Sequence, residues 1–154
     1  MPNGSGPANL HATAIVLGDR GLLIRGESGS GKTTLALTLI AVCRSAGWFA
    51  SLVSDDQVLV SAGTGRLVCR APEPIKGLVE TRGRTPQPIG NEQAAVINLV
   101  VRLVEEDAAP RYAEDQFEEI EGCRLPLLVL PARNVEGALP ALCSWLSLPP
   151  FDRK

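Results

Sequence analysis

A glycine-rich stretch near the start of the chain, GESGSGKTT at residues 26–34, carries the residue types that bind phosphate. It meets the pattern G-x-x-x-x-G-K-[ST]. The glycines let backbone N–H groups turn toward phosphate oxygens, and a following helix adds its positive N-terminal end. In this pattern Lys32 bridges the terminal phosphates and the Thr33 hydroxyl ligates magnesium. The motif therefore predicts a nucleotide-binding loop, whose contact residues are Gly26, Glu27, Ser28, Gly29, Ser30, Gly31, Lys32, Thr33 and Thr34.

Two adjacent acidic residues, Asp55 and Asp56, follow the next apolar run after the loop. When one helix joins two parallel strands, the C-terminal ends of both strands face the same cleft. One carboxylate there can ligate magnesium, and the other can accept the proton of an attacking hydroxyl. An Asp-Asp pair that only begins a turn is the alternative interpretation. The position behind a phosphate loop favours the functional interpretation, but it does not decide which aspartate is the base.

Three further polar residues could reach the same cleft. His11 is the one histidine of the chain, and a lone histidine at the start of a strand is more typical of a surface residue than of a catalyst. Glu80 and Arg82 stand together in GLVETRG. They could form a solvated ion pair; alternatively, Glu80 could complete a magnesium shell and Arg82 could hold a phosphoryl group. The sequence leaves these two interpretations equal.

The elements that must position these residues follow from the hydropathy pattern. Apolar runs at 11–17 and 21–26 are joined by GDR, which predicts a hairpin leading into the phosphate loop. Apolar residues at helical spacing from 32 to about 46, stopped by Gly47, predict the helix that follows.

The rest of the chain adds further strands. Because strands outnumber helices, we expect an α/β fold with a mixed β-sheet around the phosphate-loop helix. The expected elements are a strand, an acidic break and a second strand over 48–60, a strand at 66–70, a short helix near 75–79, a Val-rich central strand at 94–104, an exposed acidic excursion at 105–122, a last strand at 124–131, and a terminal helix at 134–148, broken or kinked near Pro140.

Length and composition predict one globular domain over residues 11–154, preceded by a disordered stretch at 1–10 that is rich in Gly, Pro and Asn. With 15 Lys and Arg against 17 Asp and Glu, the net charge of -2 argues against sequence-independent binding of nucleic acid. The first residues lack the basic and apolar regions of a signal peptide, and no run is long enough to span a membrane. We therefore expect a cytoplasmic protein without a membrane partner.

The order of these motifs resembles the catalytic domain of the bacterial HPr kinase/phosphorylase family, in the short form that lacks the N-terminal domain. The shared features are a histidine fifteen residues before the first glycine of the loop (His11 and Gly26), the loop GESGSGKT itself, the Asp-Asp pair, and an E-x-R-G segment reached through APEPIKGLVETRG. Together these motifs cover residues 11–83.

The resemblance implies the nucleotide-binding core shared by HPr kinase and phosphoenolpyruvate carboxykinase. It implies an ATP- and magnesium-dependent serine kinase that phosphorylates HPr or a related phosphocarrier of a bacterial phosphotransferase system. It also implies a homo-oligomer, a hexamer in the family. The glycine-rich, basic C-terminal segment linked to dephosphorylation in the family is not recognisable here, which leaves the reverse, phosphate-dependent reaction open.

The resemblance also assigns roles to residues. It implies that Asp56, supported by Asp55 and oriented by His11, takes the proton from the acceptor serine. It puts Glu80 on magnesium together with the phosphate-loop threonine. An arginine in the loop after the long strand belongs to the family's active site, and Arg111 is the candidate in this chain.

Two other classes of function remain open at this stage. A small-molecule kinase on a phosphate-loop scaffold would carry an arginine-rich lid, which the acidic segment 105–122 does not resemble. A nucleotide-dependent switch that recognises guanine would commonly contain an N-K-x-D segment, and none occurs in the chain.

Overall fold

The computed structural model describes residues 6–110 and 115–152, which form strands with two α-helices and two short 3₁₀ helices. In chain order the elements are β1 (Ala8–Leu10), β2 (Ala12–Leu17), β3 (Arg20–Arg25), α1 (Lys32–Ser45), β4 (Ala50–Ser54), β5 (Val58–Gly63), β6 (Arg66–Arg70), η1 (Glu73–Ile75), β7 (Leu78–Val79), β8 (Gln87–Pro88), β9 (Ala95–Val104), η2 (Glu106–Ala108), β10 (Gln116–Ile120), β11 (Cys123–Pro131) and α2 (Val135–Leu146).

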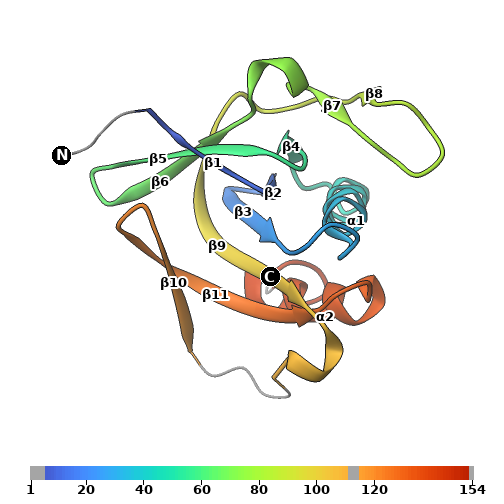
Figure 1. Cartoon of the computed structure of the whole chain (residues 1–154). Helices are drawn as coiled ribbons and strands as arrows, with labels where there is room; N and C mark the ends of the chain where they lie inside the picture. Colours follow the sequence, from blue (N-terminus) through green and yellow to red (C-terminus); the bar gives the residue numbers. More distant parts are fainter. Residues whose placement is uncertain (1–5, 111–114, 153–154) are drawn as a thin grey trace.

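One curled, mixed sheet organises the molecule (Figure 1). Its strand order is β1-β5-β6-β9-β3-β2-β4, and β11, with β10 beside it, pairs with the C-terminal part of β9. Strand β9 runs parallel to β3 and β11 but antiparallel to β6. The separate pair β7-β8 forms a small lobe above the N-terminal end of α1. The prediction of a mixed sheet around the phosphate-loop helix is confirmed.

Strand β2 lies between the phosphate-loop strand β3 and the acidic strand β4. It pairs antiparallel with both of them, so β3 and β4 run parallel to each other. The N-terminal end of β2 therefore lies at the same edge of the sheet as the C-terminal ends of β3 and β4. The two strands that flank α1 are thus close, as expected, but a third strand separates them.

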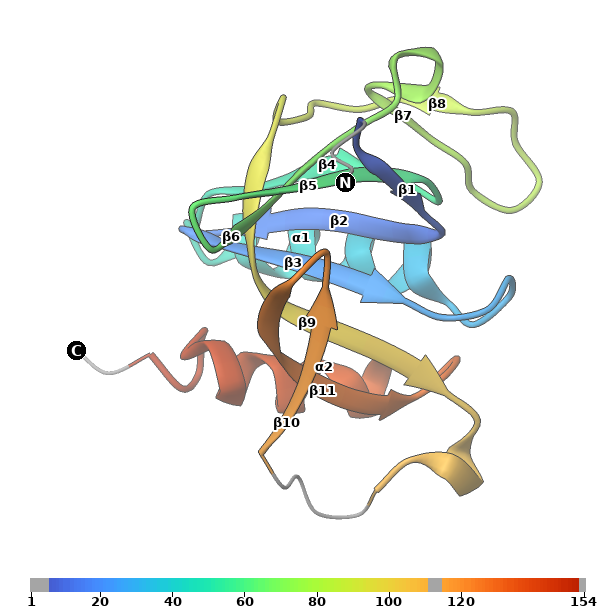
Figure 2. The ribbon, with the colours of Figure 1, turned by 60° about the vertical axis from the view of Figure 1, so that its left-hand side comes forward.

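Hydrophobic cores lie on both faces of this sheet. Helices α1 and α2 cover one face, where Leu22, Leu39 and Leu142 are fully buried. Figure 2 shows both helices behind the strands. The opposite face is closed by the curled β5-β6 and β10-β11 hairpins, over residues such as Leu23 and Val100. Successive residues along β3, and likewise along β9, are buried alternately on the two faces. The sequence of each strand is therefore a nearly continuous apolar run.

Most local predictions are confirmed. The hairpin before the phosphate loop forms, with Gly18 at φ 63° in the turn between β2 and β3. Helix α1 ends at Ser45, and Gly47, two residues later, has φ 82° and donates its N–H to the carbonyl of Arg44. Such a left-handed residue after the last turn is a common helix terminator.

Two strands lie where the sequence predicted none. Residues 8–10, which were predicted to be disordered, form β1 and pair with Val58–Val60 of β5. Residues 116–120, within the predicted acidic excursion, form β10 and pair with β11. The acidic Glu118 is tolerated in this strand because it forms ion pairs with Arg25 and Arg102. Both predictions failed because the stabilising partners are distant in sequence.

Two helix predictions also need correction. The short helix expected at 75–79 is a 3₁₀ turn at Glu73–Ile75 followed by strand β7, because Gly77 adopts φ 72° and ends the turn. The terminal helix was expected to be broken or kinked near Pro140; the break is absent, because α2 runs without interruption from Val135 to Leu146. Pro140 has no N–H to donate to the carbonyl of Glu136, four residues earlier. Both residues are exposed, so water can satisfy that carbonyl.

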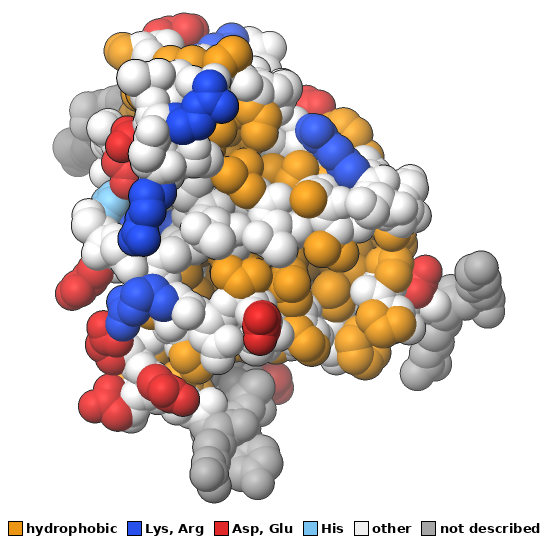
Figure 3. Space-filling model, turned by 90° about the vertical axis from the view of Figure 1, so that its right-hand side faces the viewer, with side chains coloured by type: hydrophobic (Ala, Val, Ile, Leu, Met, Phe, Trp, Pro, Cys, Tyr) orange, Lys and Arg blue, Asp and Glu red, His pale blue; other side chains and the backbone are white. Residues whose placement is uncertain are grey.

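The side of the molecule that carries the two helices exposes many hydrophobic side chains (Figure 3). Val42 of α1 and Trp145 of α2 are among the exposed large hydrophobic residues of the described chain. Charged side chains gather along the left margin of this view, which faces the viewer in Figure 1. Among the described residues, neither helix has the length and apolar character needed to cross a membrane.

Candidate functional site: a phosphate-loop cleft

The phosphate loop joins β3 to α1 in a conformation that depends on glycine. Gly29 and Gly31 have φ of 82° and 96°, a region that side-chain-bearing residues rarely adopt. A Cβ on Gly26 would lie 2.5 Å from the Ser30 hydroxyl oxygen and 3.2 Å from the Cβ of Leu103, so a side chain at that position would displace the buried Ser30 side chain. The three glycines therefore specify one loop shape.

The N-terminus of α1 is open to an anion. Its N-cap, Gly31, provides no side-chain cap, and the first turn contains no acidic residue. The first N–H groups of a helix have no partner within the helix and carry a partial positive charge. This terminus, with the glycine loop before it, has the properties of a phosphate-binding cradle.

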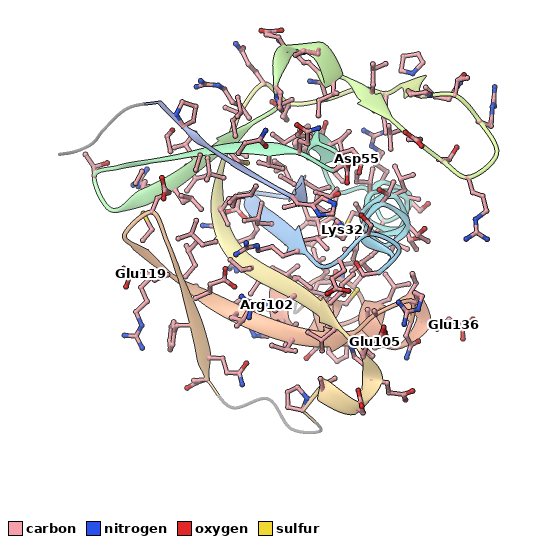
Figure 4. All side chains as sticks on the ribbon, viewed as in Figure 1. Lys32, Asp55, Arg102, Glu105, Glu119 and Glu136 are labelled. Atoms are coloured by element: carbon pink, nitrogen blue, oxygen red, sulfur yellow. The ribbon has the colours of Figure 1, made fainter. Side chains whose placement is uncertain are left out.

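Lys32 is buried at the base of this loop (Figure 4). Its ammonium Nζ donates to the carbonyl oxygens of Gly26 at 2.9 Å and Glu27 at 3.2 Å. Burial lowers the pKa of Lys32 below its ordinary value, while the negative charges of Asp56 and Asp55 oppose this effect. Within the described residues, the hydrogen-bond partners of the Lys32 ammonium are thus backbone carbonyls, which it can exchange for phosphate oxygens.

Asp55 lies at the C-terminal end of β4, next to the first turn of α1. The Thr33 hydroxyl donates to its Oδ1 at 2.7 Å, and the Thr13 hydroxyl donates to the same oxygen at 3.0 Å. The backbone N–H of Glu80 lies 3.5 Å from Oδ2. Asp55 is only 7% exposed. Its carboxylate is therefore fixed in place beside the one side chain that a phosphate loop offers to magnesium.

Asp56 has a different environment from its neighbour. Its Oδ1 lies 2.8 Å from Nε2 of His11, and the two side chains are 64% and 46% exposed. The backbone of Asp56 adopts φ 68°, and its N–H donates to the Thr13 hydroxyl at 3.3 Å. The pair also turns the chain from β4 into β5, so the turn and the functional interpretations hold together.

A cleft of about 880 Å³ joins these residues. The phosphate loop and the two aspartates form one wall, and residues 75–86 form the other. Glu80 and Arg82 both line the cleft, and in the described part of the chain neither takes part in an ion pair. Arg84, which was not predicted, lines the same wall.

Most of the predicted site residues thus lie together. The phosphate loop, Asp55 and Asp56, His11 and the Glu80 segment meet at one edge of the sheet. Arg111 lies outside the described residues. Within them, no three His, Cys, Asp or Glu side chains form a cluster able to hold a metal. The metal ligands available at this edge are hydroxyl and carboxylate oxygens.

Thr13 belongs to the site although it was not predicted from the sequence. This residue is fully buried, donates to Asp55 and accepts from the N–H of Asp56. A signal was present: Thr13 is the one polar residue of an apolar strand and stands two positions after His11, which places both side chains on the same side.

Comparison with known proteins shows which family the chain resembles. The family model of the HPr Serine kinase C-terminal domain matches residues 5–138. HPr kinase/phosphorylase from Caldicellulosiruptor bescii is 33% identical over 135 residues, covering 80% of this chain and 42% of the relative. The protein of that name from Malacoplasma penetrans is 30% identical over 134 residues, covering 79% and 42%. The chain thus spans less than half the length of these relatives.

A solved structure gives the same result for the fold. The structure of the Hpr(Ser) kinase/phosphatase from Coxiella burnetii superposes with a TM-score of 0.75, covering 90% of this chain and 95% of that chain, at 23% sequence identity. At this identity the likeness concerns the fold. Taken with the family match over residues 5–138, it leads to one conclusion: the chain belongs to the HPr serine kinase C-terminal domain family.

Proposed function

We propose that the chain is an ATP- and magnesium-dependent serine kinase domain whose acceptor is a seryl hydroxyl of HPr or a related phosphocarrier. The observation that carries the proposal is the convergence of three groups in one cleft. These are the phosphate loop, the buried Asp55 beside the Thr33 hydroxyl, and the exposed pair of Asp56 and His11. We further propose that the reaction takes place in the cytoplasm.

The residues fit magnesium. Mg²⁺ prefers oxygen ligands, and it uses few protein ligands because it keeps several waters and binds substrate phosphates. The Thr33 hydroxyl and the Asp55 carboxylate are such ligands, and Glu80 lines the same cleft. When bound, magnesium would neutralise negative charge on the transferring phosphate.

The different environments of the two aspartates suggest different roles. Asp55 is buried and accepts two hydroxyl hydrogen bonds, as suits a fixed metal ligand. Asp56 is exposed to the cleft and paired with His11, so an acceptor can approach it. We therefore assign the metal to Asp55 and the general base to Asp56.

The proposed transfer follows from these roles. Asp56 accepts the proton of the seryl hydroxyl, the seryl oxygen forms a bond to the γ-phosphorus, and the bond from that phosphorus to the bridging oxygen of ADP breaks. Lys32, the loop N–H groups and Arg82 hold the phosphates during the transfer. In the reverse direction, with phosphate as acceptor, the protonated Asp56 would return the proton to the serine.

The direct test mixes the purified protein with HPr, Mg²⁺ and γ-labelled ATP. We expect label on a seryl residue of HPr, and none on HPr whose acceptor serine is replaced by alanine. Asp56→Asn should abolish the transfer, whereas Asp19→Asn, an exposed carboxylate at the far end of the β2-β3 hairpin, should not. No transfer to HPr, combined with transfer to a small hydroxyl metabolite, would instead support the alternative of a small-molecule kinase.

A further inference from the structure

The connection between β11 and α2 packs directly against the phosphate loop. The backbone N–H of Arg133 donates to the carbonyl of Ser30 at 2.9 Å. A Cβ built on Gly31 would lie 3.5 Å from the Arg133 nitrogen, so the two backbones are in contact. Arg133 itself has φ 55°, a left-handed conformation that is unfavourable for arginine. The chain therefore adopts an uncommon backbone conformation at the point where it contacts the loop.

The Arg133 side chain extends this contact. Its Nη2 donates to both carboxylate oxygens of Glu105, at 2.8 and 2.5 Å. Its Nη1 lies 3.5 Å from the carbonyl oxygen of Gly29. Glu105 comes directly after β9, and Figure 4 shows it at the C-terminal end of that strand. Three segments distant in sequence thus meet at one guanidinium group, which we name the Arg133–Glu105 clasp.

The energetics of the clasp indicate a local role. Arg133 and Glu105 are 55% and 66% exposed, and exposed ion pairs contribute little to global stability. A glycine-rich loop, in contrast, has much conformational freedom to lose when it binds a ligand. Contacts at Gly29, Ser30 and Gly31 restrict that freedom before the ligand arrives, which improves affinity by preorganisation.

We infer that Arg133, held by Glu105, is a positioning residue that keeps the phosphate loop in its nucleotide-binding shape. This inference rests on the proposed function, because it takes the loop's ligand to be a nucleotide. The Arg133 guanidinium lies at the carbonyl of Gly29 and its backbone N–H binds the carbonyl of Ser30, whereas Asp56 and His11 belong to the proposed acceptor side of the cleft. Loss of the clasp should therefore weaken nucleotide binding and leave the transfer step nearly unchanged.

Isothermal titration with MgATP tests the inference on the wild-type protein and on Arg133→Ala, Glu105→Gln and Arg133→Lys. We expect the first two variants to bind MgATP about three- to tenfold more weakly, with kcat at saturating ATP within about twofold of wild type. Arg133→Lys keeps the positive charge but loses the paired N–H donors of the guanidinium, so its affinity for MgATP should lie between that of wild type and that of the other two variants. Arg20→Ala is the matched control, since Arg20 forms an exposed pair with Asp19 at the opposite end of β3.

A double variant tests whether Glu105 acts through Arg133. If it does, Arg133→Ala combined with Glu105→Gln should bind MgATP no more weakly than Arg133→Ala alone, because the guanidinium that Glu105 holds is already absent. A further loss of affinity in the double variant, or affinities equal to wild type in Arg133→Ala and Glu105→Gln, would overturn the inference while leaving the proposed function intact. A wild-type protein that binds no MgATP would overturn both.

Discussion

Replacement of Asp55 by asparagine separates the proposed metal role of this residue from its structural role. The amide oxygen of asparagine can accept the hydrogen bonds that Thr13 and Thr33 now donate to Oδ1. The amide nitrogen would take the place of Oδ2, where it would face the N–H of Glu80. Shape is therefore preserved, while the negative charge is lost.

The expected effect on stability is small. A hydrogen bond to a charged group contributes about 1.5–3 kcal/mol and a neutral one about 0.5–1.5 kcal/mol, so the two hydroxyl bonds to Asp55 lose about 1 kcal/mol each. Asp55 is only 7% exposed, and removing its charge also removes a desolvation cost that offsets part of this loss. A net change of about 1 kcal/mol corresponds to about 2–4 °C in Tm for a domain of this size.

The expected effect on catalysis is much larger. Removing one preorganised electrostatic group from a transition state typically lowers kcat by about 10²–10³. We expect at least this loss for Asp55→Asn, together with a higher Mg²⁺ concentration for half-maximal activity. The variant should also bind MgATP with a changed pH dependence. Because the charge of Asp55 opposes the burial that lowers the pKa of Lys32, its loss should lower that pKa further and move the alkaline limit of binding to lower pH.

The assay measures phosphorylation of HPr against Mg²⁺ concentration and pH, with melting curves of the same preparations. Asp19→Asn, which removes an exposed carboxylate far from the cleft, should match wild type in all three. A folded Asp55→Asn protein with kcat within about threefold of wild type and unchanged magnesium dependence would refute the metal assignment.

Three further substitutions or modifications test the fold around the site. Gly21→Ala should lower the free energy of unfolding, measured by urea denaturation, by about 3 kcal/mol, because the new Cβ would lie 2.1 Å from the Val96 carbonyl oxygen. An unchanged midpoint urea concentration would contradict the register between β3 and β9. Thr13→Val should lower the free energy of unfolding by about 1–2 kcal/mol and lower kcat, whereas Thr13→Ser should keep the stability and the kcat of wild type. Equal stability and equal kcat in the two variants would exclude a role for the hydroxyl. Burial raises the pKa of Cys69 from 9.0 to about 12, so the thiolate fraction at pH 8 falls to about 10⁻⁴. Alkylation of Cys69 should therefore be fast only after denaturation, which mass spectrometry can measure.

The sequence predicted the elements whose signals are local. The hairpin of β2 and β3 follows from two apolar runs around a turn, and α1 follows from helical spacing that ends at Gly47. The phosphate loop is the clearest case, because its glycines are required by backbone angles within the loop itself. Each of these features depends on residues within a few positions of one another.

The features that were missed depend on distant residues. Strand β1 exists because β5, about fifty positions away, supplies its hydrogen bonds. Strand β10 carries Glu118 because Arg25 and Arg102 lie beside it in the folded chain. The contact of Arg133 with Ser30 joins segments about a hundred positions apart. A pattern read along one sequence contains no signal for such pairs, so these partners became visible only in the fold.

The order of strands explains why this site contains a histidine and a threonine beside its aspartates. In a simple doubly wound sheet, the phosphate-loop strand and the acidic strand would be neighbours or separated by a parallel strand, and C-terminal strand ends alone would form the edge. Here the antiparallel β2 lies between β3 and β4, so its N-terminal end enters that edge. Thr13 thereby reaches both aspartates, and His11 reaches Asp56. The antiparallel strand β2 thus gives the two adjacent aspartates different partners, and these different partners are the basis of the separate roles that we propose, a metal ligand for Asp55 and a general base for Asp56.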